Sequence, residues 1–291
     1  LTEIFASLPN LTSLKINLML CPFIKRNPNV PDLLVNIWTF PSTRLLPRVA
    51  TVERMTSILN AVAANSTTLT INSLSHDRLP FEFFFQNPKK MAVISTAFRY
   101  LTSLELLLDY SDLPNDTHAP QAFANLGKCL RAAPLLKDLS LGFQGRRKVD
   151  VTALLASFAE DEYTLPHLST LQLQGMVTTE TDLCDFLVRQ KQTLTTVTLG
   201  GEGVKAVRQP VNGGIFLDIG SWKGLVSCLT EELELDKAGS CVVYLQGDLK
   251  GLQSDESWIF EEAVEAREAV SQENQIHVVE YTVEIAAMSP V

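Results

Sequence analysis

Short segments with one alternating pattern recur along the chain. In each of them two apolar residues flank a polar one, as Leu104 and Leu106 flank Glu105. A period of two is typical of a strand with one buried face, so the apolar pair is expected to point inward and its neighbours outward. The seven segments are LPNLTSLKI (8–16), NSTTLTI (65–71), FRYLTSLEL (98–106), APLLKDLSL (133–141), LPHLSTLQL (165–173), KQTLTTVTL (191–199) and, more faintly, CLTEELEL (228–235).

The stretches that precede these segments have a helical period instead. VERMTSILNAVAAN, PQAFANLGKCLRAA and ETDLCDFLVRQ each place apolar residues on one side of a helix. The segments are centred on Leu14, Leu69, Leu104, Leu139, Leu171, Val197 and Leu233, which are 55, 35, 35, 32, 26 and 36 residues apart. A helix and a short strand repeated at this spacing cannot bury their apolar stripes alone, so the pattern predicts a stacked solenoid.

The L-x-x-L-x-L core of these units resembles the long, irregular leucine-rich repeats of the ribonuclease-inhibitor-like type, especially those of fungal F-box proteins. The resemblance covers about residues 1–236 and implies an α/β leucine-rich-repeat solenoid, a curved parallel β-sheet lined by helices, with about seven irregular repeats. The Asn or Cys that usually follows the strand is missing. Its place is taken by Met19, Leu74, Asp109, Gln144, Met176 and Glu202, so less regular repeats are expected.

Two regions depart from the repeat. Residues 22–50 contain five prolines and are expected to be an insertion that leaves the solenoid. Residues 237–291 are expected to form a capping region that covers the last repeat, because an open end would expose apolar surface and a sheet edge. The cap is expected to contain a helix over 254–272, with Ile259, Phe260, Ala263, Val264 and Val270 on one side, and then a strand over 276–285.

Composition narrows the classes of partner. The formal net charge of −9 and the pI near 5.0 argue against nucleic acid or an anionic membrane, both of which require a basic face, and favour a basic protein partner. No apolar run approaches the roughly 18 residues needed to span a bilayer. We therefore expect a monomer with no membrane segment. The chain begins at Leu1, inside a repeat pattern, so preceding sequence is expected.

The number and spacing of the cysteines indicate the cellular compartment in which the protein is expected. Cys21, Cys129, Cys184, Cys228 and Cys241 are odd in number and scattered, with no C-x-x-C pair, so reduced thiols in the cytoplasm or nucleus are expected. Sequons at Asn10, Asn65 and Asn115 leave a secreted protein open as the alternative.

Motifs for chemistry are weak. Gly201, Gly203 and Ala206 satisfy a loose G-x-G-x-x-A spacing, but Pro210 and Gly213–Gly214 follow too soon for a crossover helix. The histidines His76, His118, His167 and His277 form no zinc motif and are expected at turns or on the surface. The aromatic cluster of Phe81, Phe83, Phe84 and Phe85 is expected in the core. We therefore expect that the protein binds no cofactor or metal and is not an enzyme. A hydrolase or cofactor enzyme on an α/β fold is kept as an alternative, after the two binding functions given below.

The candidate site is the outward side of the predicted sheet. Short polar residues there would let a protein partner approach closely, and Glu231, Glu232, Glu234 and Asp236 would form a negative patch at one end. The resemblance implies the substrate-recognition region of an F-box subunit of a cullin-based ubiquitin ligase, which binds the ligase adaptor only if an F-box exists upstream. A stand-alone scaffold, inhibitor or secreted recognition protein is the alternative. The expected partner-binding residues are Lys15, Thr70, Glu105, Ser140, Gln172, Thr198, Glu232, Glu234 and Asp236.

Overall fold

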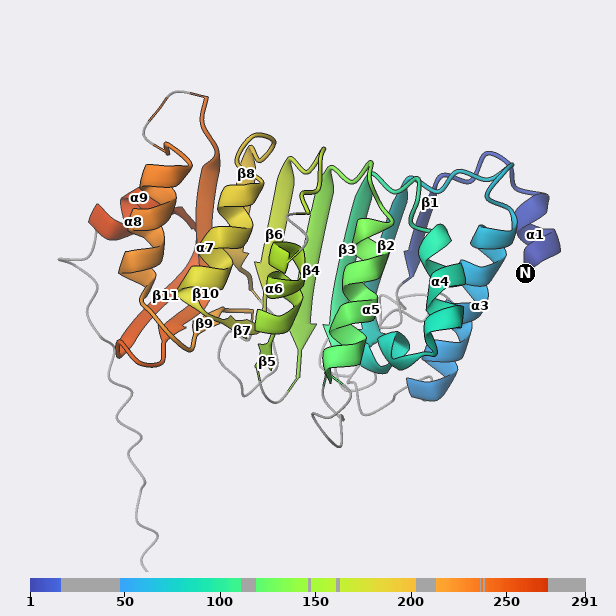
Figure 1. Cartoon of the computed structure of the whole chain (residues 1–291), viewed down its shortest axis with the longest axis horizontal. Coiled ribbons are helices and arrows are strands. Elements are labelled where there is room, and N and C mark those ends of the chain that lie inside the picture. Colours follow the sequence, from blue (N-terminus) through green and yellow to red (C-terminus); the bar gives the residue numbers. More distant parts are fainter. Residues whose placement is uncertain are drawn as a thin grey trace, which may run out of the picture.

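The protein is an α/β molecule built on one large open sheet. In this computed structural model, the described residues are 1–16, 48–110, 119–145, 148–160, 163–202, 213–235, 237 and 239–271. They form an 11-stranded sheet in the order β1-β2-β3-β4-β6-β8-β10-β9-β7-β5, with β11 paired to β10. The β10–β11 pair is antiparallel and the other described pairs are parallel (Figure 1).

The main strands follow one another across the sheet in chain order. They are β1 (Ser13–Ile16), β2 (Ser73–Pro80), β3 (Ser103–Asp109), β4 (Asp138–Gln144), β6 (Thr170–Gln174), β8 (Thr196–Gly200), β10 (Val242–Gly251) and β11 (Glu256–Glu265). Three short strands, β5 (Val149–Asp150), β7 (Met176–Thr178) and β9 (Phe216–Leu217), form a smaller parallel strip that joins the sheet through β10.

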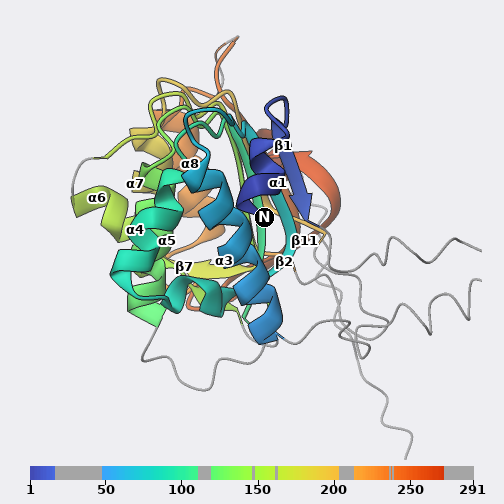
Figure 2. The ribbon, with the colours of Figure 1, turned by 90° about the vertical axis from the view of Figure 1, so that its right-hand side faces the viewer.

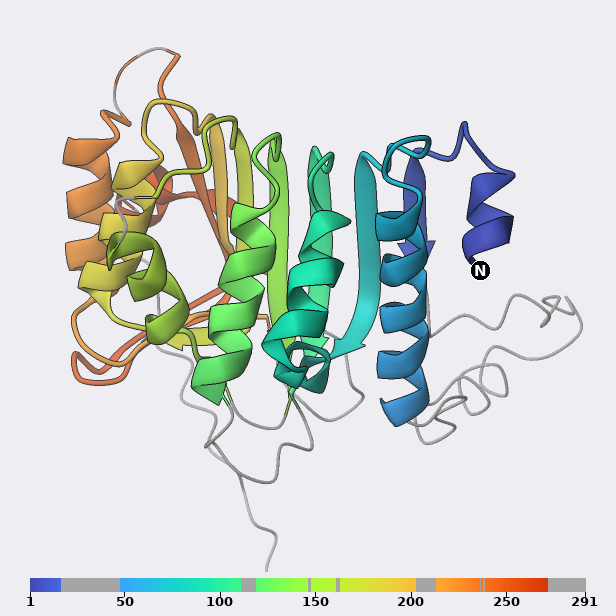
Figure 3. The same cartoon turned by 45° about the vertical axis from the view of Figure 1, so that its right-hand side comes forward.

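The helices form a layer against one face of the sheet. They are α1 (Thr2–Ala6), α3 (Arg48–Ala64), α4 (Pro88–Thr96), α5 (Ala119–Arg131), α6 (Thr152–Glu160), α7 (Glu180–Arg189), α8 (Trp222–Glu232) and α9 (Ala266–Ser271). Each packs against the next along the chain, and Figures 2 and 3 show α3 to α8 side by side on the same side of the strands. Local capping fixes where several begin, since Asn87, Thr179 and Ser221 accept hydrogen bonds from the first turns of α4, α7 and α8.

One residue of each main parallel strand shares a register, and this register lines the core. Leu74, Leu104, Leu139, Leu171, Val197 and Val243 are paired in series and are all buried, and Leu14 pairs with Leu74. The alternation read from residues 98–106, 133–141, 165–173 and 191–199 is therefore confirmed as β-structure with an inward-facing apolar pair. The faintest segment, 228–235, is not a strand. Residues 228–232 are the end of α8, and residues 233–235 form the turn after it.

The aromatic cluster lies in the core, as predicted. Phe81, Phe83 and Phe84 are fully buried in the short helix η1 (Phe81–Phe85), and Phe85 is partly buried. The Phe81 ring lies 5.0 Å from the Phe123 ring of α5, centroid to centroid. The cluster joins the end of β2 to the helix layer.

The predicted C-terminal helix is wrong over its first half. Residues 256–265 form β11, which pairs antiparallel with β10, and only 266–271 are helical. Trp258 and Phe260 point inward and Ile259 outward, a period of two that a helix would not produce. As a strand, β11 pairs with the edge of β10, whose backbone groups the predicted helix would have left unpaired. The predicted strand over 276–285 lies outside the described residues.

Most of the proline-rich insertion, through residue 47, also lies outside the described residues. Its last three residues, 48–50, are not an excursion but the first turn of α3. Among the helices in the described ranges, none combines the length and the apolar character needed to cross a membrane.

His76 is buried, not at a turn or on the surface as predicted. It occupies the inward position of β2 that Leu106 occupies in β3, with an exposed fraction of 1%. Its Nδ1 accepts a hydrogen bond from the Arg78 backbone N–H (3.1 Å), which leaves the ring neutral. Burial lowers the pKa of His76 from 6.5 to about 4, against an opposing effect of Asp77.

This burial predicts sensitivity to acid. Between pH 6.5 and 4 the unfolded chain binds a proton at His76 that the folded protein does not, so stability falls as the pH falls. At pH 5 the loss is about 2 kcal/mol. Urea unfolding of the wild type and of His76→Leu at pH 7.5 and pH 5 measures it, since leucine matches the equivalent positions. An equal pH dependence in both proteins would contradict this assignment.

Candidate functional site

The candidate site is the face of the sheet opposite the helices, which we call the open face. Strand alternation produces it: where Leu104 and Leu106 point into the core, Ser103 and Glu105 point the other way. The helices α3 to α8 lie together on the other side of the strands (Figure 2). The open face is thus free of helices in this part of the chain.

One row of side chains crosses the open face in exact pairing register. The strand pairings connect Lys15, Ser75, Glu105, Ser140, Gln172, Thr198 and Tyr244 in that order, from β1 to β10. Five of the predicted residues, Lys15, Glu105, Ser140, Gln172 and Thr198, are therefore brought together in this row. Each is exposed or half-buried.

The row is polar and internally hydrogen-bonded. The Ser75 hydroxyl donates to a Glu105 carboxylate oxygen (2.8 Å), and the Ser140 hydroxyl donates to the Gln172 amide oxygen (3.2 Å). The neighbouring row contains Ser13, Ser73, Ser103, Asp138, Thr170 and Thr196. Serine and threonine hydroxyls alternate with a few longer polar side chains across the two rows, so the surface offers a partner many hydrogen-bonding groups.

Thr70 is not on the open face. It lies in the connection that leads into β2, between the buried Leu69 and Ile71. The residue that pairs with Lys15 and Glu105 is Ser75, five positions later. The prediction was wrong because Leu69 and Ile71 have the same spacing as the inward-facing pair of a strand. The true inward pair of β2 is Leu74 and His76. Because the second residue is a histidine, a pattern based on leucines does not detect it.

The predicted acidic end of the face is also wrong. Glu232 is the last residue of α8, in the helix layer, where its carboxylate lies 3.5 Å from the Lys191 ammonium. Glu234 follows the helix with a φ of 52° and pairs with Lys237 at 2.7 Å; that hydrogen bond and charge lower the pKa of Glu234. Asp236 lies outside the described residues. The strand of this unit is instead β10, which the sequence pattern missed.

The glycine loop serves sheet pairing where the structure describes it. Gly200 ends β8 with a φ of 94°, and a Cβ there would lie 1.8 Å from the Gln246 carbonyl oxygen of β10. Only glycine permits this approach and this backbone conformation. Gly203 and Ala206 lie outside the described residues. In the described ranges, no group of three or more His, Cys, Asp or Glu side chains could hold a metal ion.

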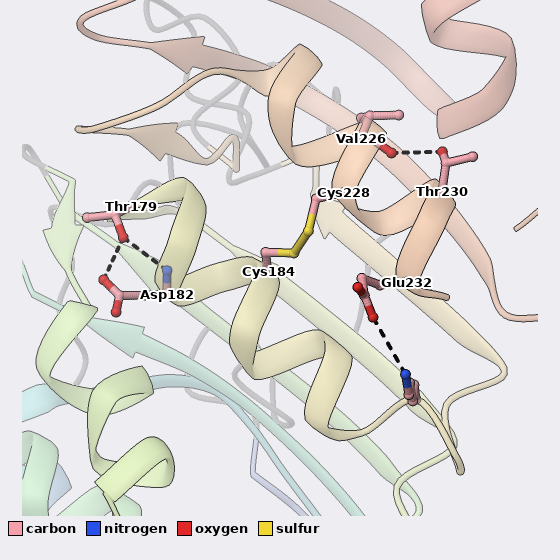
Figure 4. Close-up of a disulfide and its surroundings, with 8 residues drawn as sticks. Thr179, Asp182, Cys184, Val226, Cys228, Thr230 and Glu232 are labelled. Atoms are coloured by element: carbon pink, nitrogen blue, oxygen red, sulfur yellow. Dashed lines mark hydrogen bonds and ion pairs between the residues drawn. A yellow bond between two sulfur atoms is a disulfide. The ribbon is translucent and has the colours of Figure 1, made fainter. Parts of the chain in front are cut away.

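The expectation of reduced cysteines is wrong for one pair. Cys184 of α7 and Cys228 of α8 form a disulfide between neighbouring helices (Figure 4). The two cysteines are 44 positions apart in the sequence, so a local pattern does not reveal this contact, which depends on two helices packing side by side. Cys129 and Cys241 are buried free thiols, and burial raises their pKa values to about 12 and about 11, so neither is a nucleophile at neutral pH.

Among the described residues, two polar contacts accompany the disulfide near the ends of α7 and α8. At the start of the helices, the Glu180 carboxylate accepts a hydrogen bond from the Ser221 backbone N–H (2.7 Å). At their ends, Lys191 and Glu232 form the ion pair drawn in Figure 4. These contacts link the two helices that lie behind β8 and β10, at the C-terminal end of the open face.

Comparison of the chain with protein-family models, with curated proteins and with solved structures finds no match in any of the three.

Proposed function

We propose that the protein is a non-catalytic protein-binding module whose open face docks a protein partner. The row from Lys15 to Tyr244 carries this proposal, because it spans seven parallel strands with polar side chains that the helix layer leaves uncovered. Such a surface offers many hydrogen-bonding groups over a wide area, as protein interfaces do.

The repeating unit supports a finer proposal about the architecture. Strands that follow in chain order, in parallel and in one register, each backed by a helix, are what a leucine-rich-repeat solenoid would produce. In the fungal F-box proteins that the repeats resemble, this region selects the substrate of a ubiquitin ligase. We propose the same role here, for a monomer in the cytoplasm or nucleus, conditional on an F-box in the full reading frame.

Co-purification tests the open face directly. The full-length protein would be expressed with a tag in its native cells, beside a variant with Ser140→Arg and Thr198→Arg, and the bound proteins identified by mass spectrometry. Two arginines in the middle of the row are expected to remove a partner without disturbing the core, since both positions face outward. Recovery of ligase adaptor and cullin with both forms would support the F-box role.

A matched control separates the face from the rest of the surface. Glu232→Lys with Glu234→Lys changes exposed groups on the helix side and should leave the partner bound. A partner lost from this control but kept by the arginine variant would place the binding surface elsewhere and reject the proposal.

The disulfide favours a second candidate, a secreted recognition protein, because disulfides persist in oxidising compartments. Asn65 would not be glycosylated in the fold: it is buried, and its amide nitrogen donates to the Thr2 (3.0 Å) and Ala61 (2.9 Å) carbonyl oxygens. Asn10 is exposed. Mass spectrometry of protein from native cells decides: a glycan on Asn10 with an intact disulfide supports secretion, and reduced, unglycosylated protein supports the intracellular role.

A further inference from the structure

The strand β11 is the longer of the two outer main strands of the sheet. Among the described strands it pairs only with β10, and β1 at the opposite end, with four residues, pairs only with β2. In an antiparallel pair, every second residue of a strand directs its backbone N–H and C=O away from the partner strand. The ten residues of β11 therefore present a row of backbone groups that no described strand occupies, which we call the β11 edge (Figure 1).

Buried aromatic side chains hold β11 in place. Trp258 and Phe260 point inward and are 5% and 8% exposed. The Trp258 ring lies 6.5 Å from the Trp222 ring of α8 and 6.3 Å from the Phe260 ring, centroid to centroid. The β11 edge is thus preformed, so an added strand would not have to order β11 first.

The β11 edge has a bulge beside an exposed apolar residue. Ile259 is 54% exposed. After the pair of Phe260 and Gly247, residues 261–263 lie opposite Gln246 alone, and all three are exposed. A bulge of this kind aims its side chains away from the regular ladder, so these residues are open to a partner.

Two carboxylates at the bulge are available to a partner. Among the described residues, neither Glu261 nor Glu262 forms an ion pair or a side-chain hydrogen bond. The other carboxylates of β11 differ: Glu265 pairs with Arg267 (2.8 Å), and Glu256 accepts a hydrogen bond from the first turn of α8 (2.6 Å). The accessible charge on this strand is therefore negative and lies at the bulge.

We propose that the β11 edge binds an extended, basic segment of a protein partner, which adds to the sheet as a further strand. The backbone of the segment pairs with the outward backbone groups of β11. An apolar side chain of the segment packs against Ile259, and its lysine or arginine side chains meet Glu261 and Glu262. This surface is separate from the row of the open face, because it lies at the edge of the sheet.

Charge selects this occupant over two others. A second copy of β11 would bring four carboxylates, Glu261 and Glu262 of each chain, onto one strand pair, and like charges across strands are destabilising. The chain's own residues 276–285, which the sequence predicts as a strand, contain Glu280 and Glu284 and meet the same repulsion. The glutamates thus act against self-pairing and favour a basic segment.

The basic partner predicted from the sequence is retained with different residues. That prediction used the carboxylates near 231–236, but Glu232 and Glu234 belong to the end of α8 and the turn after it. The β11 edge offers Glu261 and Glu262 instead, beside backbone groups that can bind a strand. A basic segment is therefore expected at β11 and not at the end of α8.

Hydrogen–deuterium exchange of the purified full chain, measured by mass spectrometry, tests the β11 edge. The probes are three blocked peptides: KVKVKVK; EVEVEVE, which reverses the charge; and KVKPKVK, in which proline removes a central backbone donor. KVKVKVK is expected to slow exchange within residues 256–265 at least about fivefold, because it adds as a strand. The two control peptides should leave this exchange unchanged.

Variants separate the edge from general attraction to an acidic protein. Glu261→Lys with Glu262→Lys is expected to weaken KVKVKVK binding at least about tenfold. Glu232→Lys with Glu234→Lys makes the same change in net charge on the helix side and should keep the affinity. Ile259→Ser, which leaves the charge unchanged, should weaken binding about threefold. Equal losses in the two lysine variants would overturn the proposal.

Two results would assign the edge to another occupant and overturn the proposal. If exchange of β11 in the protein alone becomes faster in Val279→Pro with Val283→Pro, residues 276–285 already occupy the edge. If exchange of β11 slows with increasing protein concentration and a dimer appears in sedimentation, a second copy occupies it.

The open face and the β11 edge fail separately. The Ser140→Arg, Thr198→Arg variant should bind KVKVKVK as the wild type does, because neither residue lies on β11. If this variant loses a cellular partner but KVKVKVK does not bind the wild type, the β11 edge is rejected and the open face stands. If KVKVKVK binds at β11 but the arginine variant retains every partner, the edge stands and docking across the open face is rejected.

Discussion

Replacing Asp109 with alanine is expected to lower the free energy of unfolding by about 3–5 kcal/mol, the usual cost of leaving buried charges without their partner. Asp109 ends β3 with a side chain that is 5% exposed. One carboxylate oxygen lies 3.1 Å from an Arg48 nitrogen, and the other accepts a hydrogen bond from Arg78 Nε (2.8 Å). Urea unfolding of the two proteins at neutral pH measures the difference.

The expected loss of stability is large because the Asp109 carboxylate of β3 contacts arginines of two other segments, α3 and β2. Arg48 begins α3, Arg78 lies in β2, and Arg48 also donates two hydrogen bonds to Glu82 of η1 (3.0 and 2.6 Å). Without Asp109, two partly buried guanidinium groups lose the carboxylate that they share. The start of α3 is therefore joined to β2 and β3 by this ionic network.

Two further variants test whether the Asp109 charge is the cause of the expected loss of stability. Asp109→Asn retains the size of the side chain and removes the charge, so it should also destabilise the protein while folding more readily than the alanine variant. Glu234→Gln removes a solvent-exposed partner of Lys237 and should have little effect. Unchanged stability of Asp109→Asn would show that the arginines do not depend on the carboxylate.

Removing the disulfide is expected to lower the free energy of unfolding by about 3–4 kcal/mol. Cys184 and Cys228 are 44 residues apart, and a cross-link over such a loop restricts the unfolded chain by about that amount in the chain-entropy account. The comparison is between wild type and the double variant Cys184→Ala, Cys228→Ala, by urea unfolding without reductant. Alanine avoids placing a new hydroxyl between the helices.

Reductant supplies the control for this prediction. A dithiol should destabilise the wild type and leave the double variant unchanged. Alkylation in denaturant without reductant should label Cys129 and Cys241 but not Cys184 or Cys228. Labelling of Cys184 and Cys228, together with wild-type stability that does not change with the dithiol, would contradict the disulfide.

The helix layer bears on the proposed docking, because within the described ranges no helix covers the open face. Its strands are held in register by the leucines beneath them and, at the C-terminal end, by the linked pair α7 and α8. A partner would thus meet a preformed surface and would bind without ordering these strands, which reduces the entropic cost of association.

Much of the fold could be predicted from local pattern. Leucines at alternate positions, as in 104 and 106 or 171 and 173, indicated strands, and the outward residues Glu105, Ser140, Gln172 and Thr198 followed from the same period. These positions were correct because the alternation is strict and the segments are short. β2 was displaced because His76 replaces an apolar residue, and β11 was taken for a helix because Ile259 and Phe260 are adjacent apolar residues that fit either period.

By itself, the sequence determined the inward and outward sides of the central strands, because the side of a residue depends only on strand alternation and burial of apolar groups. The tertiary structure decided everything that joins distant segments. The Cys184–Cys228 bond, the two arginines on Asp109, the burial of His76 and the contact of Trp258 with Trp222 each depend on which strand or helix lies beside which. Parallel strand pairing and helix packing bring together groups that are tens of residues apart in the sequence. A local hydrophobic period contains no information on such contacts.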